Sequence, residues 1–483
     1  MSEAYRTGVA QAEVERRVDA YLDAHWDEMV GDIERLVKVP STEALDEAAP
    51  NAPFGPGPRR ALDEALSLAA NMGFEPHDAD GYVGFADFPG TTDRQLGIIG
   101  HMDVVPAGPG WTLEPFAVTR KAGNLFGRGV LDDKGPCVCA LHALKFWKNL
   151  QDEGLVPQFP YTVRFIFGAN EETGMHDVEH YQKLYDDPAF LFTPDAYWPV
   201  CYGEKGGFDG TVRSKEIPEA DRMIVSFEGG AATNAVPGHA TATVRADAST
   251  LPAAPGIAIE PAGEELATIR ATGKGAHAST PEGSVNAIGL IVDYLLEQGV
   301  GTPDERAFLE FDHKLLSAYD GSGIGIASSD EYFGALTVVG GTIAIEGDRF
   351  VQTLDSRFPT NVTADGIAEA VRALTDPIGA ELEIGDVMVP FLTKPDTPGI
   401  QALLAAYVEA TGKQDAQPFT IGGGTYARHF ARGASFGPED PSAELPEWVG
   451  PIHGPDEGVS EASLKEAFRV YALAIGKLME AEL

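Results

Sequence analysis

The stretch Leu96-Gly97-Ile98-Ile99-Gly100-His101-Met102-Asp103 decides the fold, because a short apolar run ends there in an imidazole and a carboxylate. Two further apolar runs end in the same way. Residues 162–168 are followed by Asn170-Glu171-Glu172, and residues 190–194 are followed by Asp195. In open α/β sheets, ligands bind beyond the carboxyl ends of the strands, where segments distant in sequence meet. We therefore expect these polar side chains to converge at one edge of a sheet.

The segments around this stretch alternate between helical and strand-like patterns. Apolar residues recur mostly at helical spacing from Val14 to Val37, which predicts an amphipathic helix. Residues 137–150 form the clearest second helix, and helical and strand-like runs alternate between Leu62 and Asp195. Such alternation is typical of a doubly wound, mostly parallel sheet, so we predict an α/β fold class.

The pattern changes after Gly206-Gly207, where strand-like pieces mix with helices as in an α+β domain. A helix and a glycine-rich loop after Gly399 return to the α/β pattern. We therefore expect residues 1–206 and 391–483 to form one domain and residues 207–390 to form an inserted domain, long enough for two lobes. The strands expected in the insertion are residues 240–246, 266–271, 335–339, 342–345 and 350–358, and the helices are residues 285–297, 306–319 and 364–374.

Composition and charge limit the possible partners. The chain has 483 residues, 43% of them hydrophobic, which is ordinary for a globular protein of several domains. Its net charge of -39 comes from 35 Lys and Arg against 74 Asp and Glu. Because phosphate contacts need clustered basic residues, we expect no nucleic acid partner. A solvated acidic surface explains most of the charge.

We expect a cytoplasmic protein without a membrane partner. Residues 1–11 show neither the basic nor the apolar region of a secretory signal. No apolar run approaches the roughly 18 residues needed to span a bilayer. The cysteines are Cys137, Cys139 and Cys201. The first two face different ways in the helix expected at residues 137–150, so buried thiols are favoured over a Cys-x-Cys metal site.

His101 and Asp103 could belong to a metal centre, since an imidazole can bind a metal while a carboxylate holds its other ring nitrogen. An accidental surface pair is the ordinary alternative. Asp132 and Asp133 precede the helix expected at residues 137–150, where a carboxylate could equally be an N-cap. These residues alone leave the chemistry open.

Glu171 and Glu172 are adjacent, so at the start of a helix their side chains diverge by roughly 100°. One could bind a metal while the other holds a water as a general base. Alternatively, both could form an acidic first helical turn, which the helix dipole favours. Asp195 follows Pro194 and could be a turn residue.

Five segments in this order resemble the metal-site motifs of the aminoacylase, ArgE/DapE and carboxypeptidase G superfamily of co-catalytic zinc peptidases. Within that superfamily the chain is most similar to the PepV-like bacterial dipeptidases, through residues 192–206, residues 421–428 and the long insertion. The five segments are residues 101–106, 127–136, 170–174, 194–195 and His453. The resemblance covers nearly the whole chain. It implies a zinc-peptidase-like catalytic domain with residues 207–390 as its lid.

The resemblance also implies a centre that holds two metal ions. His101 and Asp195 would bind one ion. Glu172 and His453 would bind the second, and Asp132 would bridge both. Nitrogen and oxygen ligands without thiolate fit zinc, and also manganese or cobalt.

Two neighbouring residues receive catalytic roles from the same resemblance. Asp103 would orient His101. Glu171 would be the general acid/base, taking a proton from a metal-bridging water and later giving it to the leaving amine. The resemblance further implies a cis peptide bond between Asp132 and Asp133. Asn170 departs from the usual acidic residue of the motif, and it lies outside the expected ligands.

The insertion adds three candidate residues. His277 resembles the histidine of the family's lid that donates to the oxyanion, although a surface histidine in a glycine-rich turn is the ordinary alternative. Arg357 resembles the arginine that binds a dipeptide's C-terminal carboxylate, but it could pair locally with Asp355. Asn234 resembles a substrate-contacting asparagine, and a turn role is equally consistent with its sequence.

The sequence therefore predicts a metal-dependent dipeptidase that hydrolyses short peptides with a free C-terminal carboxylate. An N-acyl amino acid amidohydrolase of the same superfamily and a non-catalytic peptide-binding relative are the alternatives. The length of the insertion further predicts a monomer, because a second lobe could replace the partner subunit that supplies the lid histidine in relatives with a short lid.

Overall fold

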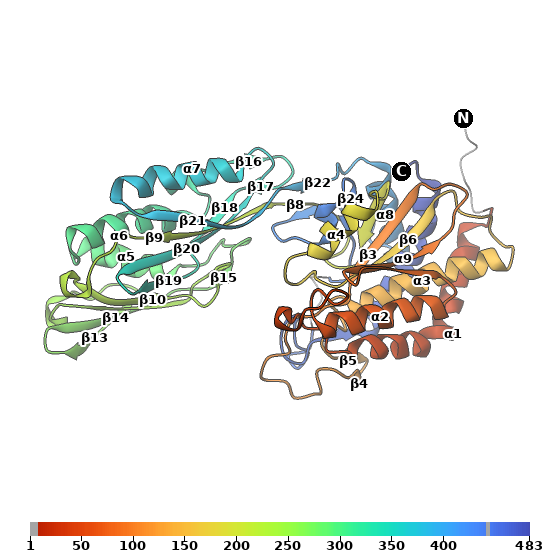
Figure 1. Ribbon diagram of the computed structural model, residues 1–483, viewed down its shortest axis with the longest axis horizontal. Coiled ribbons are helices and arrows are strands. Elements are labelled where there is room, and N and C mark those ends of the chain that lie inside the picture. Colours follow the sequence, from red (N-terminus) through yellow and green to blue (C-terminus); the bar gives the residue numbers. More distant parts are fainter. Residues whose placement is uncertain (1–7, 441–444) are drawn as a thin grey trace. The chain divides into compact units, whose positions relative to one another are not determined.

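The structure is a computed structural model that describes residues 8–440 and 445–483. The chain folds into two compact units, which we call the first unit and the second unit (Figure 1). The first unit comprises the chain up to Tyr202 together with Leu392–Phe419 and Gly424–Leu483, and the second comprises Gly203–Phe391 and Thr420–Gly423. Among the described residues, no helix is both long and apolar enough to cross a membrane.

The sheet of the first unit is parallel only at its centre. β3 pairs in parallel with β6 and β7, and β24 pairs in parallel with β7, whereas β1, β2 and β8 are antiparallel to their neighbours. The expectation of a mostly parallel sheet thus holds for the centre, and antiparallel strands close its edges. The strands run in the order β1 (Glu75–Ala79), β2 (Val83–Phe88), β6 (Thr162–Gly168), β3 (Gln95–His101), β7 (Phe190–Thr193), β24 (Gly433–Ser435), β8 (Cys201–Glu204) and β22 (Phe391–Leu392), with β23 (Phe419–Ile421) on β8.

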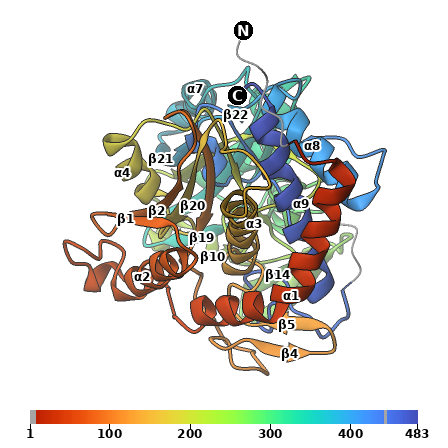
Figure 2. The ribbon, with the colours of Figure 1, turned by 90° about the vertical axis from the view of Figure 1, so that its right-hand side faces the viewer.

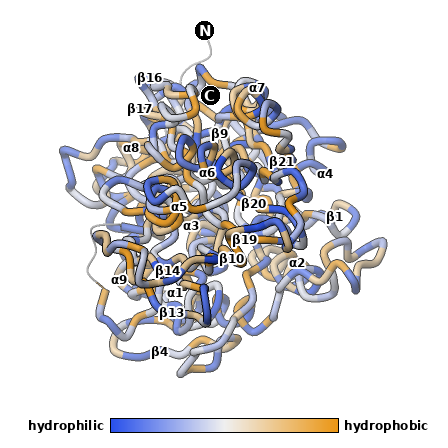
Figure 3. Tube along the Cα trace, turned by 90° about the vertical axis from the view of Figure 1, so that its left-hand side faces the viewer, coloured by the Kyte–Doolittle hydropathy of each residue, from blue (hydrophilic) through white to orange (hydrophobic). Residues whose placement is uncertain are grey.

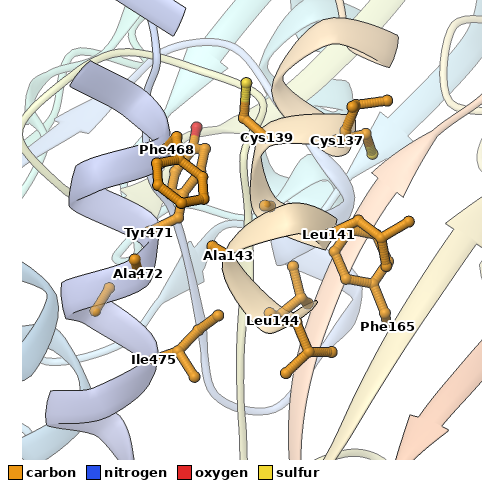
Figure 4. Close-up of a cluster of buried hydrophobic side chains, with 14 of the residues drawn as sticks. Cys137, Cys139, Leu141, Ala143, Leu144, Phe165, Phe468, Tyr471, Ala472 and Ile475 are labelled. Atoms are coloured by element: carbon orange, nitrogen blue, oxygen red, sulfur yellow. The ribbon is translucent and has the colours of Figure 1, made fainter. Parts of the chain in front are cut away.

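Helices cover this sheet, and α3 (Lys134–Asp152) is the most deeply buried of those around the core. It lies between the sheet and α9, and Figure 4 shows Cys139 on the side of Tyr471 and Cys137 on the opposite side, near the strands. Most residues of this helix are accordingly buried, on the side of the sheet and on the side of α9. Both thiols are free and buried, as the sequence predicted. The other helices are α1 (Gln11–Val37), α2 (Pro56–Asn71), α4 (His176–Leu184), α8 (Pro398–Thr411) and α9 (Glu461–Glu480), and Figure 2 shows α1 beside α9.

The second unit is built on an antiparallel sheet. Its helices α5 (Ala287–Glu297), α6 (Pro303–Leu316) and α7 (Ala364–Thr375) contribute apolar residues to one large buried cluster, and Figure 3 shows apolar positions interspersed with polar ones along α5 and α7. The expected division of the insertion into two lobes stays a prediction. The strands run in the order β13 (Ile257–Gly263), β14 (Leu266–Thr272), β12 (His239–Val244), β10 (Ile224–Gly229), β19 (Ile343–Glu346), β20 (Arg349–Phe358), β9 (Gly206–Arg213) and β21 (Glu381–Met388), with β18 (Thr337–Val339) on β20.

The bounds of α6 differ from the sequence prediction. The apolar pattern predicted a helix over residues 306–319, whereas α6 begins at Pro303 and ends at Leu316. Thr302 accepts a hydrogen bond from the Glu305 backbone, and the Glu305 side chain accepts one from the Thr302 backbone. This capping box, with proline at the first helical position, fixes the earlier start.

Asp312 on α6 is a fully buried carboxyl group, and neither of its oxygens has a hydrogen-bond partner among the described residues. Burial raises the pKa of Asp312 well above its usual value. The folded protein therefore holds this proton to a higher pH than the unfolded chain does. The resulting contribution to stability is present below the unfolded pKa, about 4, and is lost as pH rises through the folded pKa.

We expect Asp312→Leu, which keeps the shape of the side chain, to stabilise the protein against unfolding by about 1–3 kcal/mol near neutral pH. The gain should shrink as the pH approaches 4, where the wild-type carboxyl is protonated in both states. Thermal unfolding of wild type and variant at several pH values measures this difference. Glu310→Leu, on the exposed side of the same helix, is the matched control. A gain that does not change with pH would contradict this explanation.

Candidate metal centre

The register of the parallel strands brings the expected ligands to one edge of the first unit's sheet. His101, the last residue of β3, is level with Gly168 at the end of β6. On the other side of β3, Ile98 is level with Phe192 of β7. The chain beyond β6 carries the glutamate pair, and the chain beyond β7 carries Asp195. The sequence predicted this convergence from the positions where the apolar runs end.

Five side chains meet at this edge, and Asp132 lies between two histidines. Its Oδ1 is 2.9 Å from Nε2 of His101, and its Oδ2 is 2.9 Å from Nε2 of His453. His101 Nε2 is also 3.8 Å from Asp195 Oδ2, and His453 Nε2 is 3.1 Å from Glu172 Oε2. The order of contacts is Asp195, His101, Asp132, His453, Glu172. This is the order that two metal ions bridged by Asp132 would require.

The electrostatics of the cluster fit cations. Burial raises the pKa of Glu171 and Asp195 well above their usual values, and the nearby carboxylates add to the effect. Hydrogen bonds to Asp132 and Glu172 raise the pKa of His453 to about 10. Ligand atoms of His101, Asp132 and Glu172 lie within 4.8 Å of one another, as do those of His101, Glu171 and Asp195. Divalent metal ions would supply the positive charge that these groups lack.

Asp103 contacts His101 through a different atom from the one expected. His101 Nδ1 is 2.9 Å from the Asp103 backbone carbonyl, whereas the Asp103 carboxylate is 3.6 Å away. That carboxylate instead accepts hydrogen bonds from the backbone nitrogens of Glu171 and Glu172, both at 3.1 Å. The carbonyl orients the imidazole so that Nε2 faces the cluster, and the carboxylate holds the glutamate pair.

Glu171 and Glu172 lie in a turn and not at the start of a helix, because α4 begins only at His176. Gly174 and Met175, both with positive φ, separate the turn from the helix. The alternative of an acidic first helical turn is therefore wrong. Asn170 supports the turn from outside the ligand set, since its Oδ1 accepts a hydrogen bond from the His176 backbone at 3.1 Å.

The peptide bond between Asp132 and Asp133 is cis, as the resemblance implied. Asp133 is the N-cap residue of α3, but its side chain makes no capping hydrogen bond. Its Oδ2 accepts a hydrogen bond of 3.3 Å from the backbone of His101. The N-cap explanation for this acidic pair therefore does not apply.

Glu457 is a supporting residue that the sequence did not reveal. It is fully buried, and its carboxylate lies 2.6 Å from the Arg128 guanidinium. The same carboxylate accepts hydrogen bonds from the backbones of Gly129 and Leu131, at 3.0 and 3.2 Å. Glu457 thus ties the segment before Asp132 to the segment that carries His453.

Three predicted residues lie in the second unit. His277 is on β15 (Ala276–His277), which pairs with β11 (Ala235–Val236) directly after Asn234. The Arg357 guanidinium donates to both oxygens of Asp355, at 2.9 and 2.6 Å, so the local acidic partner considered from the sequence is present. Burial lowers the pKa of His277, and the charge of Arg357 contributes. His277 therefore lies beside Asn234, and it is close enough to Arg357 for an electrostatic interaction.

The fold and the cluster define a class of protein, an enzyme of mixed α/β fold whose centre of histidines and carboxylates suits a pair of metal ions. The profile of Peptidase family M20/M25/M40 matches residues 97–477, and the chain belongs to this family of metallopeptidases.

Relatives that match along nearly the whole chain agree with this assignment. A protein of Staphylococcus haemolyticus named as a dipeptidase is 31% identical over 476 residues, covering 93% of this chain and 97% of that protein. The Beta-Ala-Xaa dipeptidase of Lactobacillus delbrueckii subsp. lactis is 30% identical over 478 residues, covering 95% and 98%.

Solved structures show the same fold at lower identity. Aminoacylhistidine dipeptidase from Vibrio alginolyticus has a TM-score of 0.59 at 13% identity, with 94% of this chain and 96% of that chain covered. Human carnosine dipeptidase 1 has a TM-score of 0.57 at 14% identity, with 96% and 99% covered.

Proposed function

We propose that this metallopeptidase is a dipeptidase that acts on short peptides with a free C-terminal carboxylate. The observation that carries the proposal is the position of Asp132, with one carboxylate oxygen toward His101 and the other toward His453. The names of the relatives that match along nearly the whole chain support the substrate class.

We further propose that the cluster binds two zinc ions, with manganese or cobalt as substitutes. His101 and Asp195 would hold one ion, and Glu172 and His453 the other, with Asp132 between them. Two bound ions would lower the pKa of a water molecule and polarise the scissile carbonyl.

Glu171 is the proposed general acid/base. It is held by its backbone against Asp103 and stands beside the ligands without joining their chain of contacts. It would take the proton of the attacking water and return it to the amine that leaves. Burial favours this role, because a carboxyl group with a raised pKa is better matched to proton transfer near neutral pH.

Substrate binding is assigned to the second unit's residues. His277 would donate to the oxyanion, and Arg357 would bind the C-terminal carboxylate, with Asn234 as a further contact. Nε and Nη2 of Arg357 each donate one N–H to Asp355. The substrate carboxylate would therefore use the second N–H of Nη2 and Nη1, which lies 3.5 Å from the carbonyl oxygen of Gly422. Asp355 then orients the guanidinium for its ligand.

A panel of dipeptides, assayed with zinc, manganese and cobalt, tests the function. Each free dipeptide is compared with the same dipeptide acetylated at its N-terminus and with N-acetyl amino acids. We expect metal-dependent hydrolysis of free dipeptides. Turnover of N-acetyl amino acids alone would assign the chain as an amidohydrolase, and metal-loaded protein without turnover of either class would make it a peptide-binding relative.

A further inference from the structure

Glu439 is an acidic residue that stands next to the metal centre and is not one of its ligands. Its backbone is fixed on both sides to the segment after β7. The Glu439 nitrogen donates to the Ala196 carbonyl at 2.9 Å, and the Trp198 nitrogen donates to the Glu439 carbonyl at 2.7 Å. This pairing places Glu439 beside the chain that carries Asp195.

Glu439 is half-buried, and burial together with the charges of Asp132 and Glu457 raises the pKa of its carboxyl group to about 7, while His453 opposes this rise. Glu439 and Leu131, the residue before the bridging aspartate, also line one small cavity of about 80 Å³. The side chain therefore lies beside the segment that leads into Asp132, close enough for the two carboxyl groups to interact electrostatically.

Unlike three of its acidic neighbours, Glu439 has no basic ion-pair partner among the described residues. Asp132 and Glu172 face histidines, and Glu457 faces Arg128. Across the described part of the chain, the Glu439 carboxylate makes no hydrogen bond or ion pair, and it is not in either group of converging ligand atoms. A half-buried carboxylate that lies beside other carboxylates and has no basic partner is a favourable place for a cation to bind.

We propose that Glu439 binds the free ammonium group of the substrate's N-terminal residue and thereby selects unblocked dipeptides over N-acyl amino acids. The inference rests on the proposed dipeptidase function. In a dipeptide, the same residue carries both the ammonium group and the scissile carbonyl. If the carbonyl reacts beside Asp132, the ammonium group must lie close by, where an unpaired carboxylate complements its charge. An N-acyl substrate has no positive charge at this position.

Glu439→Gln tests the proposal, because the amide keeps the shape of the side chain and removes the charge. We expect the KM for a dipeptide to rise about 10- to 100-fold, the scale of a lost hydrogen bond to a charged group. The kcat should stay within a few fold of wild type, and the metal content should not change. If the wild type slowly hydrolyses an N-acetyl substrate, the rate of this reaction should be the same or higher in Glu439→Gln.

The pH dependence provides a second readout that a purely structural role would not produce. A free α-amino group loses its proton near pH 8. At pH values above about 8, the KM of the wild type for a dipeptide should therefore increase. The KM of Glu439→Gln should increase less, because the variant no longer binds the ammonium charge.

Asp440→Asn is the matched control, because it removes the same charge at the next position. Asp440 forms an ion pair of 3.0 Å with Lys413 and should leave the KM for the dipeptide unchanged. An unchanged KM in Glu439→Gln, or a loss of metal from that variant, would overturn the inference. If wild type hydrolyses no free dipeptide, the proposed function fails first, and the inference fails with it.

Discussion

Glu171→Gln is expected to lower the turnover of a dipeptide by about 100-fold or more, while the metal content stays near that of wild type. Glutamine keeps the size of the side chain and its position in the turn, which depends on the hydrogen bond from the Glu171 backbone to Asp103. It cannot accept a proton from water and later donate it. Steady-state kinetics and elemental analysis of the same preparation give the two quantities.

Asp132→Ala separates metal binding from proton transfer. This carboxylate lies 2.9 Å from each of two histidines, so its removal should lower both metal content and turnover. Glu171 has an oxygen within 4.8 Å of ligand atoms of His101 and Asp195, and it could therefore be a ligand itself. Loss of metal from Glu171→Gln would show that Glu171 is a metal ligand. If the variant keeps most of the wild-type turnover, Glu171 is not the acid/base.

The positions where strands end could be predicted from the sequence, because an apolar run stops where the chain leaves a buried sheet. That pattern was enough to predict that His101, Glu172 and Asp195 lie at one edge of the sheet. The other two expected ligands could not be derived in this way. Asp132 precedes a helix, and His453 lies in a loop far along the chain. Only the resemblance to known motifs assigned these two residues to the metal centre.

The remaining differences arise from contacts that a linear pattern does not contain. Whether Asp103 meets His101 through its carboxylate or its carbonyl depends on the path of the backbone beyond β3. The pairing of Glu457 with Arg128 joins residues 329 positions apart. No local spacing signals such a pair. The capping box of Thr302 and Glu305, by contrast, is a local signal and could have given the correct start of α6.

His277→Ala is expected to lower turnover by about 100-fold or more, the range for removing one oxyanion donor. The imidazole Nδ1 is 2.8 Å from the Ser279 hydroxyl, so Nε2 is the atom that would donate to the substrate. Metal content should stay at the wild-type level. His313→Ala provides the control, because His313 is an exposed histidine of the same unit that pairs with Asp293 and has no proposed role.

Mixing His277→Ala with Glu171→Gln tests the predicted monomer. If each chain uses its own histidine, neither variant can supply what the other lacks, and the mixture should show only the summed residual activities. Subunits that exchange this histidine would form mixed dimers in which one site holds both intact residues, and activity would recover. Recovery to a substantial fraction of wild type, or a stable dimer in sedimentation analysis whose dissociation abolishes turnover, would refute the monomer. The wild-type chain sedimenting as a monomer while fully active would support it, since a self-contained site needs no partner.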